Sequence, residues 1–243
     1  MMKRITLCFL LLFGIGASLV ATAEDKGSNC QGLPSERALA SNLVLAAGPK
    51  IGGLFNGTRM WGALVNRDGE ICGYATNTSD PTQVWPGSQS IAKAKAYTAN
   101  AFSLDSLALS TALLYTFTQP GHSLWSLAGA NTFNPSALAP PTGQGGGNNS
   151  IAGGMIFFGG GVPLYKDGKI IGGLGVSGDT SCADHEVAKT TRDLLGLNPP
   201  GGKLADDITY SAADGPTVFT HPLCINTKRN GNFLGNEAVA VGY

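Results

Sequence analysis

The sequence is poor in charge and lacks most of the residue patterns that carry chemistry. Charged residues make up 13% of the 243 residues, and 16 basic side chains balance 16 acidic ones. No basic stripe is present, so nucleic acid is not an expected partner. The three histidines never occur as His-x-x-x-His, and Cys-x-x-Cys is absent, so no dedicated metal site is expected. Gly-x-Ser-x-Gly is also missing, which removes the usual signature of a serine hydrolase.

Long apolar runs are missing too, except for one at the amino terminus. Lys3 and Arg4 precede an apolar block over 5–20, and small residues follow at the two positions that a signal peptidase reads before Ala23. This pattern predicts a signal peptide over 1–23 and a periplasmic or secreted protein without membrane contact after cleavage. The block has about the length of a marginal membrane span, so an uncleaved anchor remains the alternative.

Four cysteines remain after the signal segment, and an even number in an exported chain predicts two disulfides. Their spacing does not choose among the three possible pairings. The topology favours Cys182–Cys224. The tail after Pro200 has weak apolar periodicity, so it requires a covalent link to the domain, and the predicted last helix is the nearest element that carries a cysteine. Cys30 and Cys72 would then form the second pair.

Glycine is the abundant residue, with 35 copies, which indicates tight turns and close approach between backbones. Two pairs of short apolar runs flank Asp68-Gly69 and Asp167-Gly168. Asp-Gly accepts the positive φ angles of a tight turn, so both pairs predict β-hairpins. Two similar hairpins suggest one antiparallel sheet.

The remaining apolar periodicity predicts helices near 35–47, 88–102, 104–118 and 181–195. The Pro, Gly and Asn-rich stretch 131–150 is expected to be a long loop. The predicted fold class is therefore α+β, an antiparallel sheet built from two Asp-Gly hairpins with helices packed on it. We expect one domain over 24–200 and a carboxy-terminal extension over 201–243 that packs on it.

Two segments resemble a known family, namely "SIAKAKAYTANAF" and "GGGVPLYKDGKIIGGLGVSGDTSCADHEVAKTTRDLLGL". They are similar to the GlcG/HbpS-like family of small haem-binding and haem-degrading domains, which also form the carboxy-terminal part of some corrinoid adenosyltransferases. The similarity runs from about Pro34 to Leu197. The chain departs from short family members by its signal peptide, its longer loop and its cysteine-bearing tail, which together suggest an exported subgroup. The resemblance implies haem as cofactor or ligand and a homo-oligomer.

A ligand site is predicted where the two ends of the second hairpin meet the start of the last helix. Free backbone N–H groups at such a place attract anions, and glycine leaves the approach open. Haem propionates or a small carboxylic acid would suit it. The alternative is that these glycines only serve packing. The predicted binding residues are Gly159, Gly160, Gly161, Ser177, Gly178 and Asp179, with Lys95 opposite.

Haem iron needs one or two axial ligands, and two histidines are candidates. His122 follows the Pro120-Gly121 helix stop and borders an apolar segment. His185 shares a helix face with Lys189 and Arg192, a stripe typical of a solvated face, although it could also hold a propionate. His221, which lies beside Pro222, is expected to be structural.

Two functions from different classes follow. The first is an exported binding protein for haem or a related tetrapyrrole, with or without iron-dependent oxidative breakdown. The second is an enzyme or accessory factor that acts on a small carboxylated metabolite. The sequence does not decide whether the protein is an enzyme, and catalytic residues are not assigned.

Overall fold

The computed structural model describes residues 28–132 and 151–238. The signal segment 1–23 and most of the expected loop 131–150 lie outside the described residues, so both remain predictions. Within the described part of the chain, no helix combines the length and the apolarity that crossing a bilayer requires.

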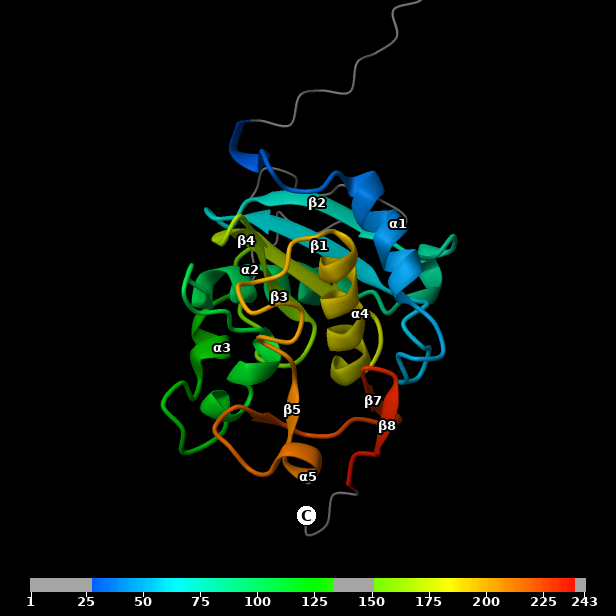
Figure 1. Cartoon of the computed structure of the whole chain (residues 1–243), viewed down its shortest axis with the longest axis vertical. Helices are drawn as coiled ribbons and strands as arrows, with labels where there is room; N and C mark the ends of the chain where they lie inside the picture. The colour runs from blue at the N-terminus through cyan, green and yellow to red at the C-terminus, as the bar shows by residue number, and fades with distance from the viewer. Residues whose placement is uncertain (1–27, 133–150, 239–243) are drawn as a thin grey trace, which may run out of the picture.

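The centre of the molecule is a sheet of four antiparallel strands in the order β2-β1-β4-β3 (Figure 1). Each predicted Asp-Gly turn joins two neighbouring antiparallel strands, which confirms both hairpins and their union in one sheet. The strands are β1 (Trp61–Asn66), β2 (Ile71–Thr76), β3 (Gly161–Lys166) and β4 (Lys169–Ser177).

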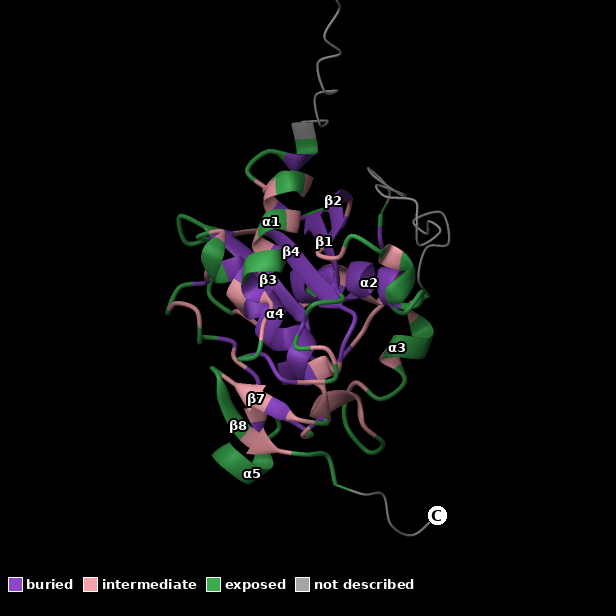
Figure 2. Ribbon diagram, turned by 90° about the vertical axis from the view of Figure 1, so that its right-hand side faces the viewer, coloured by how far each residue is buried: buried purple, intermediate pink, exposed green. Residues whose placement is uncertain are grey.

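Helices cover both faces of this sheet, which explains why its strands are buried almost throughout (Figures 1 and 2). Helix α2 (Ser88–Phe102) packs on one face, against β4, β1 and β3. Helices α1 (Glu36–Ala46) and α4 (Ser181–Leu194) pack together on the other face. This arrangement confirms the predicted α+β class.

Strand β4 alternates between glycine on one face and a branched side chain on the other. Leu174 and Val176 belong to the core under α1 and α4. Gly173 and Gly175 face α2, where an added Cβ would overlap the backbone carbonyl of Ala96 or Ala92. The alanines of α2 and the glycines of β4 therefore allow helix and strand to pack backbone against backbone.

Replacing Gly175 by alanine tests this close contact. We expect Gly175→Ala to lower the free energy of unfolding by about 1–3 kcal/mol, because α2 must shift to admit the methyl group. The matched control is Gly87→Ala, since a Cβ at Gly87 would meet nothing within 4 Å. Chemical denaturation of both variants measures the difference, and equal losses would contradict the packing argument.

The helix predicted over 104–118 is wrong. This segment instead contains a bridge between Leu104 and Leu107 and two 3-10 turns, η3 (Thr111–Leu114) and η4 (Thr116–Thr118). Its polar groups bond to other segments of the chain. The Tyr165 hydroxyl donates to the Leu104 carbonyl at 2.7 Å. The Ser110 and Thr116 hydroxyls likewise donate to carbonyls of the tail. Such side-chain contacts compete with helical hydrogen bonds.

The part of the chain after Pro200, here called the tail and described over 201–238, packs against α4 and η3. It contains a short parallel pair, β5 with β6, and an antiparallel pair, β7 with β8. The tail elements are β5 (Thr209–Tyr210), α5 (Ser211–Asp214), β6 (Thr220–His221), β7 (Thr227–Arg229) and β8 (Asn232–Gly235). Elsewhere lie η1 (Ser28–Cys30), η2 (Pro81–Gln83) and α3 (Leu127–Ala130).

The polar stripe of α4 is covered by this tail and is not a solvated face. Lys189 and Arg192 are fully buried. The Lys189 ammonium lies 2.6 Å from Asp207, and the Arg192 guanidinium lies 2.6 Å from Asp206. Buried charges are tolerated when such partners neutralise them, so the acidic residues of the tail complete the face of α4.

Two disulfides join Cys30 to Cys72 and Cys182 to Cys224, as the topological argument predicted. The first ties the segment before α1 to β2. The second ties the start of α4 to the tail, 42 residues further along the chain.

Removing the second disulfide should release the tail before it harms the sheet. Closing a loop of this length contributes about 4 kcal/mol in the chain-entropy model. We expect the double variant Cys182→Ser/Cys224→Ser to be cleaved first between residues 201 and 238 in limited proteolysis read by mass spectrometry. The control variant Cys30→Ser/Cys72→Ser should leave the tail protected. Equal protection of the tail in both variants would contradict a fastening role.

Candidate functional site

The predicted ligand residues meet at one junction, where β3 begins, β4 ends and α4 begins. Gly160 has a φ of +119°, and an added Cβ there would lie 2.6 Å from the Lys95 ammonium. The Gly160 carbonyl also accepts a 2.7 Å hydrogen bond from the Val176 N–H. The glycine therefore makes room for a buried lysine at this position.

Lys95 extends from α2 into the junction and is fully buried. Its ammonium donates to Asp184 at 2.7 Å and to the Val176 carbonyl at 3.1 Å, and it lies 4.9 Å from the centre of the Phe158 ring. Burial lowers the pKa of Lys95, and the attraction of Asp184 opposes this effect. The ammonium is thus already engaged with groups of the chain itself.

Asp179 is also engaged internally. Its carboxylate accepts hydrogen bonds from the N–H groups of Leu54 at 2.7 Å and Phe55 at 2.8 Å. It also accepts from the N–H of Thr180 at 2.7 Å. Asp179 therefore fastens the loop before β1 to the start of α4.

The start of α4 is capped by its own side chains. The Thr180 hydroxyl accepts from the Ala183 N–H at 3.3 Å, and Asp184 accepts from the Asp179 N–H at 2.9 Å. Ser177 is buried at the end of β4, opposite Trp61. The structure thus brings the predicted residues together in a packed junction, and their role in binding a ligand stays a prediction.

The two predicted axial ligands differ in their exposure to solvent. His122 is exposed in the turn after η4. His185 is fully buried under the tail, where its Nε2 lies 3.2 Å from the Ile208 N–H and 3.3 Å from the Asp207 carboxylate. His185 therefore holds the tail against α4. Neither histidine lies in the cavity described next.

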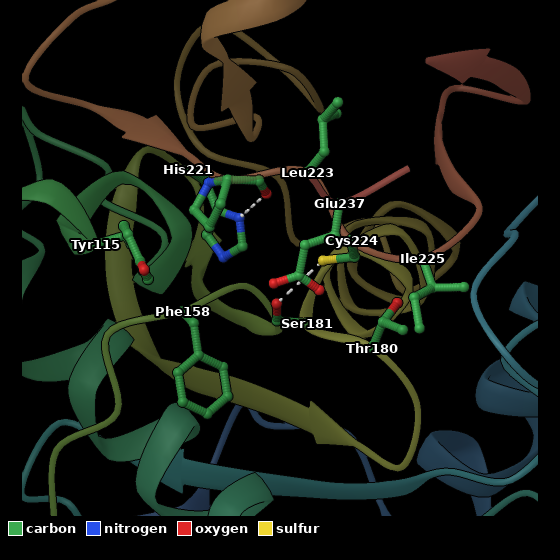
Figure 3. Close-up of a pocket in the computed structure, with 10 residues that line it drawn as sticks. Tyr115, Phe158, Thr180, Ser181, His221, Leu223, Cys224, Ile225 and Glu237 are labelled. Atoms are coloured by element: carbon green, nitrogen blue, oxygen red, sulfur yellow. Dashed lines mark hydrogen bonds between the residues drawn. The ribbon is translucent and has the colours of Figure 1, made fainter. Parts of the chain in front are cut away.

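A cavity of about 380 Å³ lies directly beside the junction, between the start of α4 and the tail (Figure 3). Tyr115 and Phe158 lie on one side, Cys224 and Ile225 on the opposite side, and Glu237 between them. Phe158 lines this cavity, and the Lys95 ammonium lies 4.9 Å from the centre of its ring. The lining residues are Tyr115, Phe158, Thr180, Ser181, His221, Pro222, Leu223, Cys224, Ile225 and Glu237.

His221 connects the cavity to the glycine junction. Its Nε2 accepts from the Gly159 N–H at 3.2 Å, and its Nδ1 lies 2.7 Å from the Pro222 carbonyl, which fixes Nδ1 as the donor. Burial lowers the pKa of His221 from 6.5 to about 4, so the ring is neutral at pH 7. Its ring lies 5.1 Å from that of Tyr115, at an angle of 51°.

Sequence reasoning missed Tyr115, Phe158 and Glu237, and it treated His221 as structural only. These residues come from four segments that no local pattern connects. One available signal was the Cys182–Cys224 pairing, because a bond to the start of α4 must carry the neighbouring residue His221 there as well.

Cys182, Cys224 and His221 place their potential ligand atoms within 4.8 Å of one another. Both sulfur atoms are engaged in the disulfide, and a metal would require thiolates. In the oxidised protein, the imidazole of His221 is therefore the one possible metal ligand of these three residues.

The family model described as "Haem degrading protein HbpS-like" matches residues 58–193. Three solved structures are similar in fold. The PduOC:heme complex has a TM-score of 0.47 and 23% identity, covering 67% of this chain and 92% of that chain. Klebsiella pneumoniae ORFY has a TM-score of 0.46 and 22% identity, and HbpS has a TM-score of 0.44 and 22% identity. Each match covers 66% of this chain and 86% of that chain. No curated protein matches the chain.

The depressed pKa of His221 predicts a pH dependence of stability. The unfolded chain binds a proton at this histidine below about pH 6.5, whereas the folded chain does not until about pH 4. Acidification between these values should therefore cost up to about 1.4 kcal/mol per pH unit, and below pH 4 the loss stops growing. Denaturation of wild type and His221→Gln at pH 7 and pH 5 isolates this contribution.

The matched control is His122→Gln, which changes an exposed histidine. It should keep the wild-type dependence, whereas His221→Gln should be less sensitive to acid. An equal pH dependence in all three proteins would mean that His221 titrates normally in the folded state.

Proposed function

The chain belongs to the HbpS-like family of haem degrading proteins, and on this premise we propose that it binds haem or a related tetrapyrrole. The observation that carries the proposal is the family match over 58–193. That range holds all four strands of the sheet together with α2 and nearly all of α4. The match therefore extends over the sheet and two of the helices packed on it, beyond any single motif.

The cavity beside the junction suits part of a tetrapyrrole. Its volume of about 380 Å³ lies within the ordinary range of small-molecule sites. Phe158, Leu223 and Ile225 offer apolar contacts, and Tyr115 offers a phenol oxygen that can bind iron. The hydroxyls of Thr180 and Ser181 line the cavity and can donate hydrogen bonds to a haem carboxylate. A bound haem would supply the iron chemistry of any oxidative breakdown.

The alternative, an enzyme or accessory factor for a small carboxylated metabolite, has less support. It relied on free N–H groups at the start of α4. Thr180 and Asp184 already cap that start, and Glu237 brings a further negative charge to the cavity. A small anion would gain little there from the helix dipole.

We also propose export to the periplasm or the outside of the cell and assembly into a homo-oligomer. Two disulfides suit an oxidising compartment. A cavity that leaves part of a tetrapyrrole outside its walls would suit coverage by a second copy. Sedimentation at micromolar concentration tests the assembly, and a monomer would count against it.

Titration with hemin tests the proposed function. We expect wild-type protein to produce a shifted Soret band that saturates at one haem per chain, with a Kd of about 1 μM or lower. Ser181→Phe should weaken binding at least about tenfold, because a phenyl group at this position fills the cavity. Thermal unfolding should show that the variant remains folded.

His122→Ala is the matched control, since His122 is exposed in a turn outside the cavity. It should bind hemin like wild type. Loss of binding in His122→Ala with Ser181→Phe unchanged would place the ligand at the turn after Pro120. A wild-type protein without a shifted band would reject the proposed function.

A further inference from the structure

The Tyr115 hydroxyl is a free oxygen in the cavity. The side chain is partly exposed, and its hydroxyl has no hydrogen-bond partner among the described residues. The backbone at Tyr115 is nevertheless fixed. Its carbonyl accepts from the Thr118 N–H at 3.1 Å, the Thr118 hydroxyl at 2.8 Å and the Gln119 amide at 3.0 Å. The backbone that carries the phenol is therefore held in place, and the phenol oxygen is available.

The imidazole of the cavity is not available. Both ring nitrogens of His221 have backbone partners, the Gly159 N–H and the Pro222 carbonyl. Binding iron through either nitrogen would break one of these hydrogen bonds in a buried place, which is costly. The ring of His221 instead packs beside that of Tyr115, at 5.1 Å between centroids.

We propose that Tyr115 is the iron ligand of the bound haem, with His221 as the residue that positions its ring; this inference rests on the proposed function. The phenol oxygen donates an electron pair to ferric iron, its O–H bond breaks, and the proton passes to bulk water. No electron is transferred. Tyrosinate is an established axial ligand of haem iron.

Charge in the cavity agrees with an anionic oxygen ligand on ferric iron. The titratable groups that line the cavity besides Tyr115 are His221, which is neutral at pH 7, and Glu237. Neither brings a positive charge that would compete with iron.

Removal of the Tyr115 hydroxyl oxygen tests whether this residue is the iron ligand. Wild-type protein with ferric haem should show a phenolate-to-iron charge-transfer band and the phenolate modes in resonance Raman spectra. Tyr115→Phe should lose both signatures and bind ferric haem at least about tenfold more weakly at pH 7. Thermal unfolding of each variant verifies that it is folded.

Tyr210→Phe is the matched control, because Tyr210 is a fully buried tyrosine whose ring lies 6.3 Å from that of His221 and outside the cavity. It should keep both spectral signatures. His221→Phe, which keeps an aromatic ring beside Tyr115, should keep them as well, with a shifted band.

The outcomes separate this inference from the proposed function. Binding by wild type with the same spectrum in Tyr115→Phe would overturn the ligand assignment and leave haem binding intact. Loss of the band in His221→Phe, with Tyr115→Phe unchanged, would assign the iron to His221. A wild-type protein that binds no hemin would overturn both.

Discussion

The ion pair between Lys95 and Asp184 is the contact on which the arrangement of the molecule depends. It joins α2 and α4, which lie on opposite faces of the sheet, past the ends of β3 and β4. Both side chains are buried, so each charge requires the other, and loss of one partner would leave an uncompensated charge in the interior. Gly160 must remain without a side chain for the pair to form.

This ion pair also occupies the junction where the sequence predicts a ligand. A glycine-rich hairpin end beside a helix start resembles an anion site when only the sequence is considered. In the folded protein, Lys95 and Asp184 fill the space that the glycines create, and Asp179 uses the N–H groups of the preceding loop. A cavity lined in part by Phe158 lies between α4 and the tail.

Local chemistry explains which parts of the fold could be predicted. Asp-Gly turns, alanine-rich periodicity and a capped helix start act over a few residues, and these gave the hairpins, α2 and α4 correctly. The segment 104–118 has helical periodicity, but its hydroxyls bond to carbonyls of the tail, about one hundred residues away in the sequence. The acidic partners of Lys189 and Arg192 are closer, 18 and 14 residues further along, but no local pattern predicts that the tail folds back over α4.

The tail forms part of the proposed binding site and is linked to the sheet domain by a disulfide. The cavity takes one wall from residues inside the family match, Tyr115, Phe158 and Ser181, and the other from Cys224 and its neighbours outside it. That second wall is held at α4 by the Cys182–Cys224 disulfide, and Tyr115 meets His221 only because the tail returns there. Tyr115, the proposed iron ligand, lies within the residues that match the family model. His221, which packs beside its ring, belongs to the tail outside that match. Binding should then depend on the disulfide, because an unfastened tail leaves the phenol without the ring that positions it.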